Sequence, residues 1–72
     1  MHIGNLIHHV MTTNNITVLQ LAQNINTTRE NMHKILNKQY IDVELLLRIS
    51  KALNHDFFKD LSEEYKYKLK KL

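Results

Sequence analysis

The chain has 72 residues, which is enough for one domain and too few for two. It contains no cysteine, so neither disulfides nor a cysteine-based zinc site can stabilise so small a core. Lys and Arg exceed Asp and Glu by 3, and this excess weakly favours a polyanionic partner. Close helix packing and self-association are therefore the expected sources of stability.

Several function classes are excluded by what the sequence lacks. No apolar run approaches the roughly 20 residues of a membrane span, and residues 1–10 have no charged start of a signal peptide. We therefore expect a soluble, cytoplasmic protein without a membrane partner. Enzyme signatures are missing, and the adjacent His8 and His9 lack the spacing of a helical metal pair. We expect no catalysis, cofactor, metal or small-molecule ligand.

The first half of the chain predicts three helices joined by short turns. With one glycine and no proline in the sequence, asparagine has to form the turns. A first helix is expected over residues 3 to about 13, because apolar residues recur there at the spacing of one helical face. Thr17 is placed to cap a second helix, and Asn26 to end it in the left-handed conformation. Thr28 should cap a third helix over residues 29 to 36.

A fourth helix is expected to begin after the cap residue Asp42 and to run through Leu53. Its aliphatic residues cover so much of the circumference that it is predicted to be the central, most buried element. His55 follows this helix and is expected either to cap it or to pack on Phe57 and Phe58.

The end of the chain predicts a short fifth helix with an apolar group at Phe57, Phe58 and Leu61. Residues 62–72 are interpreted either as a frayed basic tail or as a further amphipathic turn. The apolar residues of that turn would be Tyr65, Leu69 and Leu72. Together with Phe57, Phe58 and Leu61, their spacing is also compatible with a dimer seam at the C-terminus.

Two short helices separated by a three-residue turn, with a supporting helix on each side, match the helix-turn-helix, whose second helix enters the major groove of DNA. At about 100° per residue, the third helix has one apolar face, formed by Met32, Ile35 and Leu36. The opposite arc carries Arg29, Glu30, His33, Lys34 and Asn37. These side chains offer the donors and acceptors that read base edges, and we expect base contacts from Arg29, Glu30, His33 and Lys34.

Phosphate contacts are expected at the helix ends. The amides that start the second and third helices, beside Thr17 and Thr28, present the positive end of the helix dipole. Residues just after the third helix are placed for further contacts with the DNA backbone. The predicted phosphate set is Thr17, Thr28, Asn37, Lys38, Gln39 and Tyr40.

A structural interpretation of the same face stays open. Glu30 and Lys34 are four residues apart with the acid first, so they also suit a surface ion pair worth about 0.2 to 0.5 kcal/mol. Arg29 has no acidic residue three or four positions away within the helix, which favours a contact outside the chain.

The residues "ITVLQLAQNINTTRENMHKI", 16 to 35, resemble the helix-turn-helix of the XRE family, the lambdoid phage repressor and Cro type. "IDVELLLRISKALNHDFF", residues 41 to 58, resembles the two helices that follow in small regulators of that family. The resemblance implies base reading by Arg29, Glu30 and Lys34, with His33 beside them and Thr28 at a phosphate. The chain departs from the family where Asn26 replaces the usual turn Gly.

The resemblance and the residues together predict an all-α, five-helix bundle with a lambda repressor-like helix-turn-helix. Residues 1–61 would form the DNA-binding domain, and residues 62–72 a basic tail or short extra helix. The expected function is a sequence-specific transcriptional regulator that binds double-stranded DNA, as a homodimer. The alternative is a helix-turn-helix scaffold that serves as a protein-binding adaptor, which the absence of Asp, Glu, Lys and Arg from residues 1–28 favours.

Overall fold

Five helices account for most of the computed structural model, which describes residues 1–71 and the side chains of residues 1–70. They are α1 (Ile3–Thr13), α2 (Val18–Asn24), α3 (Arg29–Leu36), α4 (Val43–Leu53) and α5 (Phe57–Lys71). No strand occurs among residues 1–71. The predicted all-α architecture with a helix-turn-helix is confirmed, while Leu72, named above in the tail, lies outside the described residues.

The helices start where polar caps precede them. Each predicted cap accepts a hydrogen bond from the amide three residues later, at 3.1 Å for Thr17 and Gln20, 3.0 Å for Thr28 and Asn31, and 2.7 Å for Asp42 and Leu45. The side-chain oxygen of Gln20 also accepts from the backbone N–H of Thr17 at 2.9 Å, which completes a capping box at α2. These caps fix the first turns of α2, α3 and α4.

Asparagines form the turns, as predicted. Asn15, Asn26 and Asn54 have φ angles of 59°, 57° and 51°, which place all three in the left-handed region. Asparagine tolerates this conformation better than other residues with a Cβ, because its short amide can bond to nearby backbone. The sharp reversal between α2 and α3 therefore depends on Asn26.

Replacing Asn26 should separate the cost of the left-handed conformation from that of the side chain. Asn26→Ala is expected to lower the free energy of unfolding by about 1 to 2 kcal/mol, because alanine disfavours positive φ. Asn26→Gly should be close to neutral, since glycine adopts this conformation freely. Urea denaturation of both variants measures the difference, and equal midpoints would show that the turn does not depend on the φ angle at residue 26.

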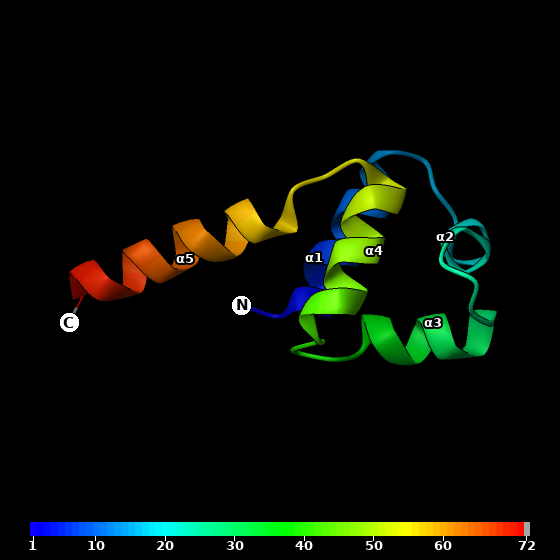
Figure 1. The fold of residues 1–72 in the computed structure, drawn as a ribbon, viewed down its shortest axis with the longest axis horizontal. Helices are drawn as coiled ribbons and strands as arrows, with labels where there is room; N and C mark the ends of the chain where they lie inside the picture. Colours follow the sequence, from blue (N-terminus) through cyan, green and yellow to red (C-terminus); the bar gives the residue numbers. More distant parts are fainter. Residues whose placement is uncertain (72) are drawn as a thin grey trace.

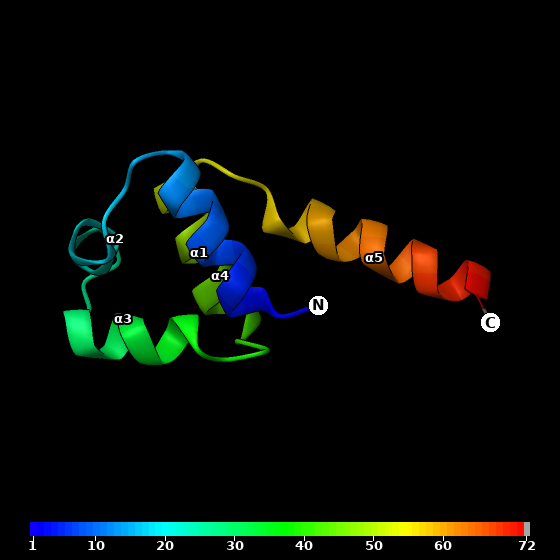
Figure 2. The same cartoon turned by 180° about the vertical axis from the view of Figure 1, so that it is seen from behind.

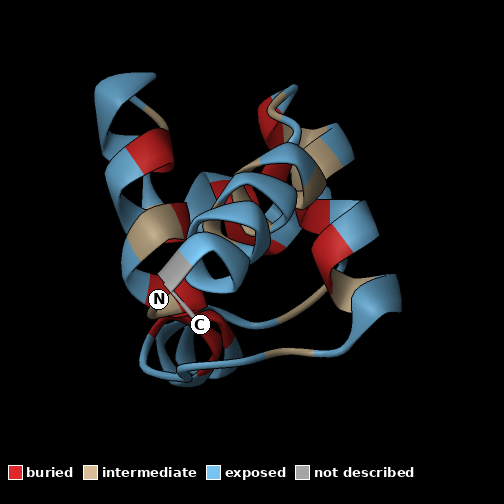
Figure 3. Ribbon diagram, turned by 90° about the vertical axis from the view of Figure 1, so that its left-hand side faces the viewer, coloured by how far each residue is buried: buried red, intermediate tan, exposed pale blue. Residues whose placement is uncertain are grey.

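The core lies between α1, α2, α3 and α4 and takes its most buried side chains from every helix (Figure 3). The side chains with no exposed surface are Ile7, Leu21, Ala22, Met32, Ile49 and Phe57. The prediction that the fourth helix is the most buried element is wrong. α1 buries five residues and α4 three. The aliphatic run of α4 is wider than the face it packs, so Leu47 remains 45% exposed.

The start of α1 rests against the backbone that follows α3. The amides of Ile3 and Gly4 donate to the carbonyls of Gln39 and Lys38 at 2.8 and 3.0 Å. A Cβ on Gly4 would lie only 2.1 Å from the carbonyl oxygen of Leu36. The single glycine of the chain therefore allows α1 to approach the end of α3 this closely.

α5 extends away from the other helices (Figures 1 and 2). Its first residue, Phe57, is fully buried, and the ring of His55 lies against it with centroids 4.5 Å apart. The expected packing of His55 on Phe57 is confirmed, and His55 Nε2 also lies 2.7 Å from Asp60 Oδ2. Residues 62–71 continue the same helix, although Tyr65 and Leu69 remain 64% and 50% exposed.

Glu64 links α5 to the start of the chain. The Met1 amine donates to Glu64 Oε1 at 2.8 Å, and the Lys68 amine lies 3.4 Å from the same oxygen. The hydrogen bond from the Met1 amine, helped by Lys68, lowers the pKa of Glu64 from its ordinary value of 4.5. Glu64 is therefore ionised at neutral pH and fixes one side of α5 next to α1.

Candidate nucleic-acid interface

The α2–α3 turn is held from outside the motif by α4. The guanidinium of Arg48 donates a hydrogen bond to the carbonyl of Ile25, at the C-terminal end of α2. Arg48 was assigned no role from the sequence, where it is one of two basic residues, with Lys51, inside the aliphatic run of the predicted fourth helix. Arg48 thus fixes the position from which α3 begins.

α3 has the two faces that its sequence predicts. Met32, Ile35 and Leu36 are buried, with 0%, 3% and 7% of their surface exposed. The predicted base-reading residues Arg29, Glu30, His33 and Lys34 are all exposed, and so is Asn37. The exposed polar arc is wider than predicted from the sequence, because Asn31 is also exposed. Its amide nitrogen donates to Thr27 Oγ1 at 2.8 Å.

The charged side chains of this arc have no partners within the described part of the chain. Among residues 1–70, the ion pairs join Met1 to Glu64, His55 to Asp60 and Lys68 to Glu64. The ion pair between Glu30 and Lys34 that the sequence allowed is therefore not formed. Arg29, Glu30 and Lys34 are available to a molecule that approaches α3 from outside.

The predicted phosphate residues divide into two groups. Thr17 and Thr28 are exposed, and their hydroxyl oxygens already accept from the amides of Gln20 and Asn31, which leaves each O–H free to donate. The side chains of the four residues that follow α3 are also exposed: Asn37, Lys38, Gln39 and Tyr40. The backbone carbonyls of Lys38 and Gln39, however, are bonded to α1. This loop is therefore held in place while its side chains remain accessible.

A hollow of about 280 Å³ lies between α3 and the neighbouring helices α1 and α2. Its lining residues are Asn5, His8, Val18, His33, Leu36 and Asn37. His33 and Asn37 also belong to the polar arc of α3, so the hollow borders that arc on the side of α1. Asn5 and His8 could not be placed here from the sequence, since only the packing of α1 on α3 brings them beside His33.

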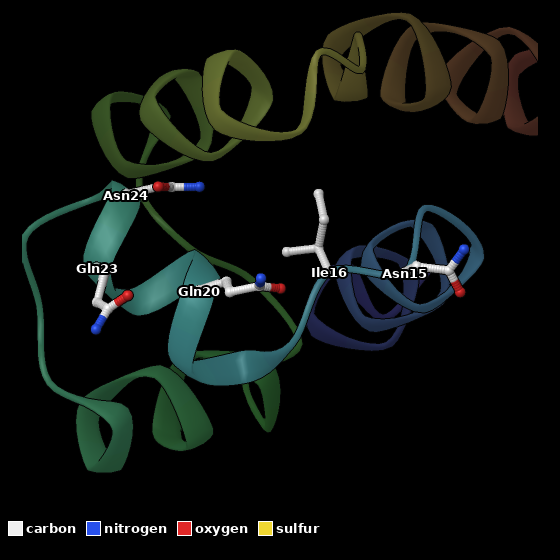
Figure 4. Close-up of a pocket in the computed structure, with 5 residues that line it drawn as sticks. All are labelled: Asn15, Ile16, Gln20, Gln23 and Asn24. Atoms are coloured by element: carbon white, nitrogen blue, oxygen red, sulfur yellow. The ribbon is translucent and has the colours of Figure 1, made fainter.

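A second hollow, of about 260 Å³, lies beside the start of α2 and is lined by Asn15, Ile16, Gln20, Gln23 and Asn24 (Figure 4). Figure 4 shows Gln20 pointing toward Ile16. None of these side chains is titratable, and the Gln20 oxygen is already bonded to Thr17. This hollow therefore offers amide groups but no charge to a ligand.

Two other kinds of site are not found in the described part of the chain. No helix there is long and apolar enough to cross a membrane. No three His, Cys, Asp or Glu side chains among the described residues gather closely enough to hold a metal ion.

A family model described as the Cro/C1-type HTH DNA-binding domain matches residues 7–65. The match includes α2, the turn and α3, and it extends into α5. It confirms the resemblance to XRE-family regulators that the sequence shows. Comparison with curated proteins and with solved structures finds no match for the chain. From the helix-turn-helix geometry and this match, we conclude that the chain belongs to the Cro/C1-type HTH DNA-binding domain family.

Proposed function

We propose that the protein is a cytoplasmic, sequence-specific transcriptional regulator that places α3 in the major groove of double-stranded DNA. The observation that carries this proposal is the exposed polar arc of α3, whose charged side chains have no ion-pair partner among the described residues. Arg29 and Lys34 suit guanine O6 and N7, and Glu30 suits the amino group of cytosine. His33 lies at the border of the arc, beside these three residues.

The DNA backbone would be held by residues at both ends of the motif. The hydroxyls of Thr17 and Thr28 sit at the N-terminal ends of α2 and α3, where backbone amides also favour phosphate. After α3, Asn37, Lys38, Gln39 and Tyr40 present exposed side chains from a loop that is fixed to α1. Contacts of this kind set the orientation of α3 without selecting sequence.

Selection of bound duplexes from a random pool tests sequence-specific binding. A regulator should enrich a defined motif, and a homodimer should enrich a palindrome with half-sites about one helical turn apart. A salt titration on an enriched duplex should then give a steep negative slope of log affinity against log salt, because phosphate contacts release counterions. The absence of both enrichment and a salt slope would refute the proposal.

We propose further that the protein acts as a homodimer that uses the apolar side of α5. Leu61 and Phe58 are half-buried near the start of this helix, while Tyr65 and Leu69 continue the same side where α5 leaves the body of the molecule. A short helix end without tertiary packing is marginal in water. Burial of Tyr65 and Leu69 against a second copy would stabilise it, and two copies would read two half-sites.

Leu69→Glu should weaken this association. A glutamate in the interface places an unpaired carboxylate where the two apolar sides would meet, at a cost of about 1 to 3 kcal/mol per site. Sedimentation equilibrium should show a larger monomer fraction than in the unsubstituted protein. Lys70→Glu, on a side of α5 away from Tyr65 and Leu69, controls for the change of charge. Equal association of both variants and the parent would exclude this side of α5 from the interface.

A protein-binding adaptor is the second candidate, and the apolar surface of α2 is the observation that favours it. Leu19 is 49% exposed on a helix that carries no charged residue. An adaptor would bind a partner protein through such a surface and would show no phosphate contacts. A flat salt dependence of DNA affinity, with no enriched duplex, would favour the adaptor.

A further inference from the structure

The hollow between α1 and α3 brings together two histidines that are 25 positions apart in the sequence. His8 comes from α1 and His33 from α3, and both side chains are exposed. The amide side chains of Asn5 and Asn37 also line this hollow, whose volume is about 280 Å³. Two imidazoles and two amides can together donate several hydrogen bonds to one anionic oxygen group.

The position of the hollow relative to the reading arc suggests which anion this is. An α-helix with its side chains is about 10 to 12 Å across, close to the width of the major groove, so the sides of an inserted helix face the phosphates of the groove edges. His33 and Asn37 belong to the side of the α3 arc that borders α1. Asn5 and His8 extend this side onto α1, beyond the groove.

The charge of this surface depends on its histidines. No Asp, Glu, Lys or Arg lines the hollow, and α2 contains no titratable residue. The other titratable side chains of the elements packed around it are His2, which caps α1, His9 on α1, Arg29, Glu30 and Lys34 on α3, and Lys38 and Tyr40 after α3. Because residues 1–28 carry no Asp, Glu, Lys or Arg, histidine is the only ionisable side chain that α1 can present to DNA.

We propose that Asn5, His8, His33 and Asn37 form a binding site for a phosphodiester group of the DNA backbone, and that both imidazoles bind it in the protonated form. The inference rests on the proposed DNA binding and assigns His33 to the backbone at the edge of the groove. Imidazole side chains change charge between about pH 5 and 8. DNA binding is then coupled to proton uptake, and affinity rises as the pH falls through this range.

Binding of the full chain to a mixed-sequence duplex at about pH 6 and about pH 8 tests the site, because phosphate contacts do not depend on sequence. Affinity should be about tenfold higher at the lower pH. The slope of log affinity against log salt should be steeper there by about 0.9, because the site neutralises one phosphate. Wild-type affinity and slope that do not change with pH would overturn the proposal.

Substitutions assign the pH effect to residues. His8→Gln and His33→Gln should each reduce the change in affinity and in slope between the two pH values. His9→Gln is the matched control, because His9 is exposed on the same helix but lines another hollow, with His55. His8→Lys should hold its charge at pH 8 and recover part of the affinity lost there. Full pH dependence in His8→Gln would refute the site, and would point to His2, whose Nδ1 accepts from the Asn5 amide.

Two further measurements distinguish a failure of the proposed DNA binding from a failure of the proposed phosphate site. Absence of salt-dependent DNA binding at both pH values would remove the proposed function itself, whereas salt-dependent binding without a pH effect would remove only the phosphate site. Inorganic phosphate added at matched ionic strength should displace DNA no better than sulfate. Stronger displacement by phosphate would overturn the assignment to the DNA backbone in favour of a free phosphate.

Discussion

Gly4→Ala should strongly destabilise the protein, although it adds only one methyl group. The new Cβ would lie 2.1 Å from the Leu36 carbonyl oxygen and 2.8 Å from that of Lys38. Both are backbone atoms, so no side-chain rotation relieves the overlap. α1 has to move away from α3, which weakens the bonds from Ile3 and Gly4 to the α3–α4 connection.

The expected loss is about 2 to 3 kcal/mol in the free energy of unfolding, after allowing for the better helix propensity of alanine. In a domain of this size it corresponds to a fall in Tm of roughly 10 to 20 °C. Thermal unfolding followed by circular dichroism measures it. Thr12→Ala, on the exposed side of the same helix, is the control and should change Tm little. A Tm for Gly4→Ala within a few degrees of the parent would show that α1 does not pack on α3 as described.

Arg29→Ala should give the largest loss of DNA affinity among single substitutions on α3. Arg29 is the first residue of that helix, is exposed and forms no ion pair within the described residues. Removing a bidentate contact to guanine should cost about 1 to 3 kcal/mol and relax the preference at one base pair. Titration on the enriched duplex gives the loss of affinity, and a repeated selection with the variant gives the loss of preference.

Lys66→Ala removes the same charge from the exposed part of α5 and serves as the control for net electrostatic attraction. It should change affinity less than Arg29→Ala and leave the selected sequence unchanged. Lys34→Ala should behave like Arg29→Ala, at a different base pair. If neither Arg29→Ala nor Lys34→Ala alters affinity or preference, another face of the protein contacts the bases.

Helix boundaries could be predicted from the sequence because local groups set them. Thr17, Thr28 and Asp42 each bond to an amide only three residues away, and asparagine tolerates the left-handed conformation that Asn26 adopts. The burial of α4 could not be predicted in this way, because it depends on how much surface the neighbouring helices cover. The sequence contains the aliphatic run but not the width of the face that packs.

In the candidate site, too, local features could be predicted from the sequence and contacts between distant segments could not. The exposed arc of α3 follows from the helical periodicity of eight residues, so Arg29, Glu30, His33 and Lys34 could be found together. Arg48 and His8 could not, since each meets the motif through a contact between distant segments. The single glycine at position 4 is the sequence feature that marks the close approach of α1 to the end of α3, but its closeness to Leu36 is seen only in the structure.

The attachment of α1 to the α3–α4 connection also bears on the order in which the protein folds. Its hydrogen bonds join residues 3 and 4 to residues 38 and 39, about 35 positions later, so they close a loop of nearly half the chain. α2 and α3 meet across a short turn and can associate first, since local contacts form faster than distant ones. α3 therefore acquires its shape early, whereas its edge with α1, including the His8 and His33 pair, is completed only when the distant ends of this loop meet.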